Sequence, residues 1–100
     1  MAGDAVWTRR AERQLTAYLD HLADVRPDLL DEALAELRSA ADAVAHRPGI
    51  ARPARWDGAQ EVSVRRWSKL LVLERVGDQL RVLALYDQRQ DLSAVDPFSE

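Results

Sequence analysis

The sequence predicts an α+β domain, in which a hairpin of two helices packs on a small antiparallel sheet in the order β-α-α-β-β-β. Three observations predict this class. The first half holds two stretches whose apolar residues recur at the three-to-four-residue spacing of amphipathic helices. The stretch Glu61–Asp91 holds three runs with the character of β-strands. A short strand-like pair, Val6-Trp7, precedes the first helical stretch.

The first helix is expected from about Arg9 to Asp24, directly after a short edge or pairing strand within Asp4–Trp7. Thr8 is a suitable N-cap, because its hydroxyl can accept a backbone N–H that has no partner inside the helix. The apolar face of this helix consists of Ala11, Leu15, Tyr18, Leu19 and Leu22.

A second helix is expected after Arg26-Pro27, since proline suits the first turn of a helix and the residue before it avoids helical geometry. Asp31 and Glu32 place negative charge at the positive end of this helix. Arg47-Pro48-Gly49 ends it. Its apolar stripe consists of Leu30, Leu34, Leu37, Ala41 and Val44. The two helices form an antiparallel hairpin, whose joint apolar face is expected to cover the sheet.

Three consecutive strands are expected to form the sheet. Val62 and Val64 alternate with polar neighbours, which is the pattern of a half-buried strand. Gly77-Asp78 is expected to form the turn between the next two strands, because glycine accepts the positive φ of tight hairpin turns. Both of these strands are apolar on two faces, so the second face also needs a cover. Ile50–Gly58 is expected to be an irregular loop. Residues 93–100 are expected to be a mobile tail of the single domain 1–100.

Composition excludes several kinds of site. The chain has 100 residues and no cysteine, so it can form neither disulfides nor thiolate zinc sites. Two histidines, His21 and His46, do not make a metal site, and no cofactor is expected. No run is long enough to span a bilayer and no signal-peptide pattern is present, so we expect a cytoplasmic protein without a membrane partner. The segment Arg52–Arg89 carries eight Lys and Arg against five Asp and Glu, which marks where an anionic partner would bind.

The chain contains no Walker-type loop and no GxGxxG, HExxH or GxSxG motif. The most informative cluster is Arg65-Arg66-Trp67-Ser68-Lys69, at the expected turn between the first two strands of the sheet. Its cations and aromatic ring could hold phosphates and stack a base. Alternatively, they form a charged hairpin tip with Trp67 packed on the edge of the core. Both interpretations stay open at this point.

Two further residues bear on catalysis. Arg81 and Asp87 have the same parity in the last strand, so they would share a face if the strand is regular. Cleavage of a phosphodiester needs a base, an acid and cations, and arginine supplies only the last of these. Proton transfer would therefore require Asp87 or Tyr86, although Tyr86 also fits the role of a core aromatic.

Several short segments, in order and spacing, carry a resemblance to a known family. The opening Val6-Trp7-Thr8-x-x-Ala11-x-x-x-Leu15 and the segment His46–Arg52 are the first two. Val62–Trp67, Leu71–Val76 and Gln88–Asp91 are the others. Together they resemble the ParE/RelE superfamily of toxins from bacterial type II toxin–antitoxin systems, over about Asp4–Leu92, which implies a RelE/ParE-like fold.

Four positions depart from the pattern of the RelE-type, ribosome-dependent ribonucleases. The resemblance implies arginine, tyrosine, arginine and histidine where this chain has Gln60, Leu73, Ala84 and Asp87. These departures and the long helical hairpin make the chain more similar to ParE. That similarity implies poisoning of DNA gyrase by stabilising its cleaved-DNA complex, without chemistry by the toxin itself.

The same resemblance implies a cognate, ParD-like antitoxin of the ribbon-helix-helix or a similar class, a toxin–antitoxin hetero-oligomer, and contact with operator DNA only through the antitoxin. Antitoxin contacts are expected in the groove between the helical hairpin and the sheet, at Arg52, Arg65, Arg75 and Arg81. Contacts with the target are expected at Arg66, Trp67 and Arg89.

Two other functions stay open from the sequence. One is a RelE-like mRNA endoribonuclease whose candidate catalytic residues are Arg65, Lys69, Arg81 and Asp87. The other is a relic that has lost its toxicity and still binds an antitoxin.

Overall fold

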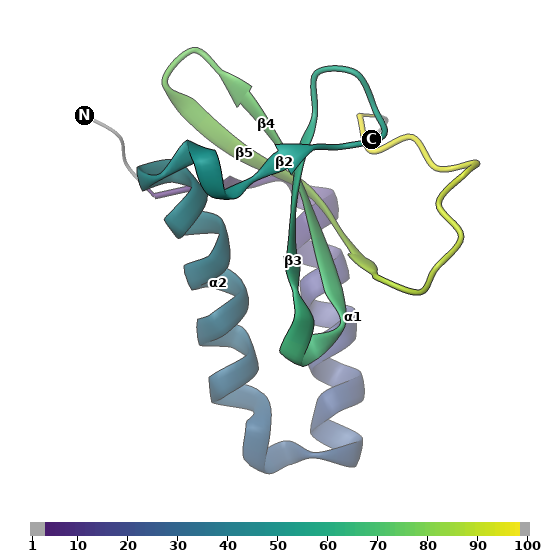
Figure 1. Cartoon of the computed structure of the whole chain (residues 1–100). Coiled ribbons are helices and arrows are strands. Elements are labelled where there is room, and N and C mark those ends of the chain that lie inside the picture. Colours follow the sequence, from purple (N-terminus) through teal and green to yellow (C-terminus); the bar gives the residue numbers. More distant parts are fainter. Residues whose placement is uncertain (1–3, 99–100) are drawn as a thin grey trace.

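The computed structural model describes residues 4–98, and its elements follow the predicted order with one short addition (Figure 1). The helices are α1 (Arg9–Val25) and α2 (Leu30–His46). The strands are β1 (Val6–Trp7), β2 (Arg52–Pro53), β3 (Gln60–Val64), β4 (Lys69–Val76) and β5 (Gln79–Asp87). Residues 99 and 100 of the expected tail lie outside the described residues.

The added element is β2, which pairs antiparallel with the first two residues of β3, Gln60 and Glu61. The expectation of a wholly irregular segment over Ile50–Gly58 is therefore wrong at Arg52–Pro53. A strand of two residues that contains a proline has no recognisable alternation, and proline is tolerated there because β2 is an edge strand.

Thr8 caps α1 as predicted. Its Oγ1 accepts the backbone N–H of Ala11 at 3.2 Å, which satisfies one of the donors left free at a helix start. The same hydroxyl donates to the carbonyl oxygen of Leu83 at 3.1 Å, and the Thr8 backbone N–H donates to that of Val82 at 3.0 Å. The cap therefore also ties the start of α1 to β5.

The two helices form the predicted antiparallel hairpin and lie side by side (Figure 1). A 3-10 turn at Pro27–Leu29 joins them, so the break falls at the proline as expected. Arg38 of α2 forms a bidentate ion pair with Glu12 of α1, and its guanidinium carbon lies 4.7 Å from the centre of the Trp7 ring. This arginine therefore connects α2 to both α1 and β1.

The sheet has the strand order β1-β5-β4-β3-β2. β1 runs parallel to β5, whereas all other neighbours are antiparallel, so the sheet is mixed rather than wholly antiparallel as predicted. Parallel pairing is possible here because both helices and the rest of the sheet connect β1 to β5, which gives the chain the long return that parallel neighbours require. The predicted turn at Gly77-Asp78 is confirmed, with a φ of +61° at Gly77.

β4 and β5 are apolar on both faces, as predicted. The helices cover one face, where the buried strand residues are Leu71, Leu73, Leu80, Val82 and Leu85. The second face holds Leu70, Val72, Leu83, Ala84 and Tyr86. Leu83 and Ala84 are consecutive on one face because Leu83 is the extra residue of a β-bulge: Val72 pairs with Ala84, and Leu73 already pairs with Val82.

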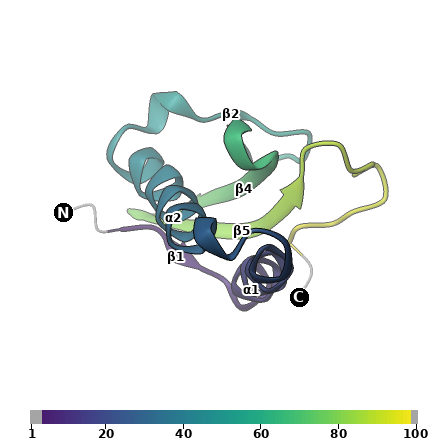
Figure 2. The same ribbon diagram turned by 90° about the horizontal axis from the view of Figure 1, so that it is seen from below.

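Loop 54–59 and the C-terminal segment cover the second face. Ala59 and Leu92 are buried there, and Trp56 donates its indole N–H to the carbonyl oxygen of Val95 at 2.8 Å. Residues 93–98, which belong to the segment expected to be a mobile tail, lie folded back toward the sheet in this structure, with Pro97 buried. Figure 2, which looks along the helices, shows α1 on one side of β5 and the loop before β3 on the other.

Neither helix of the described part is long and apolar enough to cross a lipid bilayer.

Candidate functional site

The predicted site residues lie at both ends of the sheet. Lys69 and Asp87 pair in register at one end, where a 3-10 turn, Arg65–Trp67, joins β3 to β4. Arg81 pairs in register with Glu74 near the other end. Arg81 and Asp87 are six positions apart along β5, which corresponds to roughly 20 Å at about 3.3 Å per residue.

The bulge at Leu83 also places Arg81 and Asp87 on different faces. Leu80 and Val82 face the helices, so Arg81 between them faces the other way, where its Nη1 lies 3.5 Å from Oε2 of Glu74. Asp87 lies beside Lys69 on the helix side, with 4.0 Å between Oδ2 and Nζ. The expectation of a shared face is therefore wrong, because the bulge adds one residue to the alternation.

The candidate catalytic set thus does not converge. Arg65 and Lys69 lie at the end of the sheet where Asp87 is, and Arg81 is far from them on the opposite face. The candidates for proton transfer are also poorly placed. The backbone N–H of Arg89, 2.8 Å from Oδ1, lowers the pKa of Asp87, which keeps it ionised. Burial on the covered face raises the pKa of Tyr86, so its hydroxyl keeps its proton.

Arg66 and Trp67 are held by two carboxylates of α2. The guanidinium of Arg66 pairs with both Glu32 and Glu36, and its carbon lies 4.6 Å from the centre of the Trp67 ring. Trp67 donates its indole N–H to Oε2 of Glu36 at 3.0 Å, and only 8% of the residue is exposed. The structure therefore favours the packed hairpin tip over a free ring for stacking a base. Sequence reasoning missed the two glutamates, although their four-residue spacing on one helix face was the available signal.

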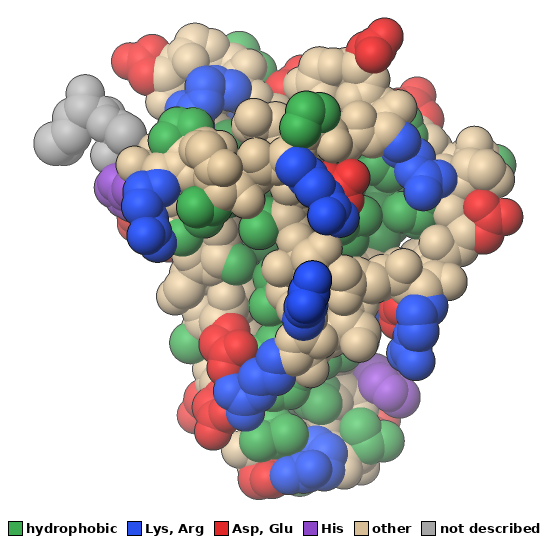
Figure 3. Space-filling view, viewed as in Figure 1, with side chains coloured by type: hydrophobic (Ala, Val, Ile, Leu, Met, Phe, Trp, Pro, Cys, Tyr) green, Lys and Arg blue, Asp and Glu red, His purple; other side chains and the backbone are tan. Residues whose placement is uncertain are grey.

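A partly exposed apolar strip lies between α2 and β3, and we call it the α2–β3 surface. It consists of Ala40, Ala51, Val62 and Val64, each packed against the main core. β2 pairs only with Gln60 and Glu61, so the outer edge of Val62–Val64 has no partner strand among residues 4–98. Figure 3 shows hydrophobic side chains gathered in this region, with Lys and Arg side chains along it.

Of the four predicted antitoxin contacts, Arg52 and Arg65 flank the α2–β3 surface, since they lie on β2 and directly after β3. Arg52 is largely exposed and pairs with Glu61 at 3.3 Å. Arg75 lines a separate hollow of about 340 Å³ beside Pro53 and Gly58. Arg81 is on the other side of β4 from β3, so the four cations do not form one patch.

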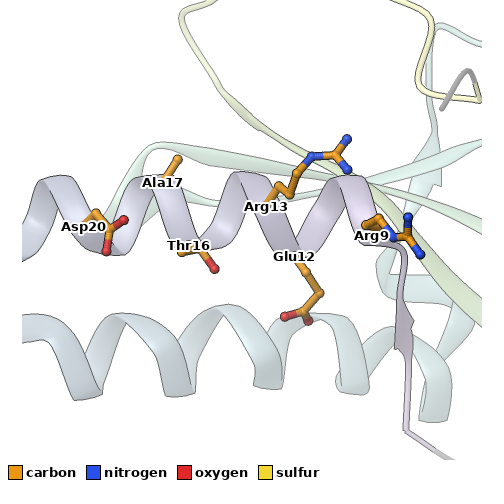
Figure 4. Close-up of a pocket in the computed structure, with 6 residues that line it drawn as sticks. All are labelled: Arg9, Glu12, Arg13, Thr16, Ala17 and Asp20. Atoms are coloured by element: carbon orange, nitrogen blue, oxygen red, sulfur yellow. The ribbon is translucent and has the colours of Figure 1, made fainter.

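Another hollow lies along α1, and Figure 4 shows two of its lining residues, Glu12 and Thr16, pointing toward the neighbouring helix. Its volume is about 470 Å³, and its lining consists of Arg9, Glu12, Arg13, Thr16, Ala17 and Asp20. All six residues belong to one helix, and Glu12 is already paired with Arg38. It therefore gathers no convergent set of groups from different elements.

The fold is similar to that of a chain in a solved structure described as the chromosomal ParDE TA system from P. aeruginosa. The TM-score is 0.75, and the match covers 86% of this chain and 96% of that chain at 20% sequence identity. No protein-family model matches the chain, and no curated protein matches it either. The likeness confirms the RelE/ParE-like fold that the resemblance implies.

Proposed function

We propose that the chain is the toxin of a ParDE-type toxin–antitoxin pair, and that it acts by binding DNA gyrase rather than by chemistry of its own. The fold that it shares with a chain of a ParDE system supports this proposal. The separation of Arg81 from Lys69 and Asp87 also supports it, because cleavage of a phosphodiester needs its cations and proton donors around one phosphate.

The ribonuclease alternative receives less support from the positions that differ from the RelE pattern. Leu73 lies beneath the helices and Ala84 beneath the second cover, and both are completely buried. In this chain neither the Leu73 nor the Ala84 side chain can contact a substrate. The binding mechanism therefore accounts for more of the observed geometry than the enzymatic one does.

The α2–β3 surface is the observation that carries the antitoxin part of the proposal. The free edge of Val62–Val64 offers backbone N–H and C=O groups to an added extended segment. Ala40 and Ala51, partly buried beside that edge, add apolar surface on which apolar side chains of the partner can pack. Arg52 and Arg65 at its flanks suit an acidic segment. The partner is thus an amphipathic, acidic antitoxin segment, and the product is a toxin–antitoxin hetero-oligomer.

For the target we propose a contact at Arg89, whose side chain is 82% exposed next to the last strand. Arg66 and Trp67 were predicted to join it, but both have intramolecular partners on α2. Their proposed part is to hold the hairpin tip in place beside the target-binding residue.

Supercoiling of relaxed plasmid by purified gyrase tests this function. We expect inhibition that rises with the amount of added protein and is reversed by the cognate antitoxin. A cell-free translation reaction run in parallel is expected to proceed normally. Translation arrest with unchanged supercoiling would favour the ribonuclease, and no effect in either assay would favour the relic.

A further inference from the structure

A cleft of about 290 Å³, which we call the distal cleft, lies at the end of the molecule where β4 begins and β5 ends. The second half of α1 forms one wall, and the turn from Arg65 to Ser68 forms another. Its polar lining includes Tyr18, His21, Ser68, Lys69, Asp87 and Arg89. The proposed antitoxin surface is on another element pair. The predicted target contacts Arg66, Trp67 and Arg89 line the distal cleft, so the inference below rests on the proposed function and refines that contact.

Lys69 is the central charge of the distal cleft. Its side chain is only 14% exposed, and its Nζ lies 4.3 Å from the centre of the Tyr18 ring. The Asp87 carboxylate, 4.0 Å away, is beyond hydrogen-bonding distance, and the ammonium donates no hydrogen bond within residues 4–98. A largely buried ammonium without a hydrogen-bond acceptor is costly, because it has lost most of its hydration without replacement. Burial accordingly lowers the pKa of Lys69.

The groups around this ammonium are mostly hydrogen-bond donors. Burial and the charge of Asp87 raise the pKa of Tyr18, so the phenol keeps its proton and can donate. The Ser68 hydroxyl and the Arg89 guanidinium add further donors. The one carboxylate, Asp87, already accepts from the backbone N–H and the guanidinium of Arg89. The cleft therefore combines several donors with a single carboxylate, which is already engaged by Arg89.

The walls of the distal cleft are fixed by the fold. Ser68 has a left-handed backbone with φ of 54°, which is unusual for a residue other than glycine. Its carbonyl oxygen accepts the backbone N–H of Gln88 at 2.9 Å, so the turn before β4 is tied to the end of β5. Trp67 is buried and bonded to Glu36. Ser68 and Lys69 consequently lie on backbone that is tied to the sheet, which lowers the entropy cost of binding a ligand there.

We propose that the distal cleft binds a phosphate group, with Lys69 as its central ligand and Arg89, Tyr18 and Ser68 as further donors. A tetrahedral oxyanion accepts hydrogen bonds from several directions at once. This geometry matches the Lys69 ammonium and the surrounding donors, which come from separate elements. The cleft is larger than one phosphate, so the group that carries it also fits. That group is either a free nucleotide or a nucleic-acid strand, and the two share the same phosphate chemistry.

The test is a titration followed by two-dimensional NMR of the labelled full chain at constant ionic strength. The probes are pyrophosphate, AMP and a short single-stranded DNA with or without a 5′-phosphate. We expect saturable shifts of the Ser68, Lys69 and Arg89 amide signals. If AMP and the 5′-phosphorylated DNA bind but the unphosphorylated DNA does not, the cleft recognises a terminal phosphate. If the two DNA strands bind equally, the cleft recognises backbone phosphates. Absence of saturable shifts with every probe would overturn the proposal.

Variants separate a built site from general charge attraction. Lys69→Met is expected to weaken binding about tenfold or more, since a charge-assisted hydrogen bond is lost. Asp87→Asn is expected to strengthen binding, because it removes the one negative charge in the cleft. Arg13→Gln, an exposed cation elsewhere on α1, is the matched control and should change nothing. Lys69→Arg keeps the positive charge at this position and is expected to retain most of the binding. It therefore separates loss of the charge in Lys69→Met from loss of folding. Equal weakening by Lys69→Met and Arg13→Gln would overturn the site.

Discussion

Glu36 accepts the indole N–H of Trp67 at 3.0 Å between Oε2 and Nε1, and it simultaneously pairs with Arg66. This contact joins the middle of α2 to the turn between β3 and β4, two segments that are 31 positions apart in the sequence. It fixes the distance between the two walls of the α2–β3 surface. It also holds the turn that supplies one wall of the distal cleft.

Loss of the Glu36 contact with Trp67 should destabilise the fold more than loss of the nearby ion pair between Glu32 and Arg66. Glu36→Ala leaves the nearly buried indole N–H of Trp67 without its acceptor, which costs about 1–3 kcal/mol. Glu32→Ala removes only an ion pair between half-exposed groups, which costs about 0–1 kcal/mol. Urea unfolding of both variants measures the difference. An equal loss in both would contradict the role assigned to Glu36.

The cover on the second face of the sheet should contribute to stability. Leu92 is 3% exposed, so Leu92→Ala should lower the free energy of unfolding by about 2–5 kcal/mol. Val25→Ala, at a residue that is 55% exposed, is the control and should stay within about 0.5 kcal/mol. Equal, small losses in the two variants would show that Leu92 does not help to hold this cover on the sheet.

The ion pair between the helices should make stability depend on pH. The hydrogen bonds from Arg38 lower the pKa of Glu12 from its ordinary value of 4.5, so folding favours the ionised form. The pair therefore stabilises the fold fully above that value, and its contribution is lost as the pH falls through the lowered pKa. Both side chains are partly exposed, so the effect is below about 1 kcal/mol.

The measurement compares the wild type with Glu12→Gln at about pH 6 and about pH 3. The wild type should be the more stable of the two at the higher pH, and the difference should shrink on acidification. A difference that stays constant over this range would show that folding does not perturb Glu12.

Antitoxin binding should depend on the α2–β3 surface. Ala40→Arg places a long cation over the strip beside β3, and it should weaken binding of the cognate antitoxin at least about tenfold. Ala17→Arg makes the same change on the exposed face of α1 and should leave affinity unchanged. Isothermal titration calorimetry gives both values, and circular dichroism confirms that both variants fold. Undiminished affinity in Ala40→Arg would place the antitoxin elsewhere.

Local signals in the sequence predicted most of the fold. Thr8, Pro27 and Gly77 mark a helix start, a helix break and a hairpin turn, and each acts through its own backbone or hydroxyl. The spacing of apolar residues predicted the two helices and the two strands, joined by a hairpin turn, that are apolar on both faces. These features depend on neighbours within a few residues, so a single sequence contains them.

The rest depends on contacts between distant residues. The bulge at Leu83 leaves no mark in an uninterrupted apolar run, and it alone moves Arg81 away from the face of Asp87. The partners of Arg66 are on α2, and the cover over Tyr86 comes from segments without any periodic pattern. The expectation that Arg81 and Asp87 share a face is wrong for this reason: shared parity in a strand does not survive an inserted residue.

The central claim is that this protein poisons gyrase by binding. Its most direct measurement is the amount of linear DNA released from purified gyrase after detergent and protease treatment, with increasing amounts of added protein. We predict that linear DNA rises with the protein and falls again when the cognate antitoxin is present. Unchanged linear DNA at amounts that arrest bacterial growth would contradict the claim.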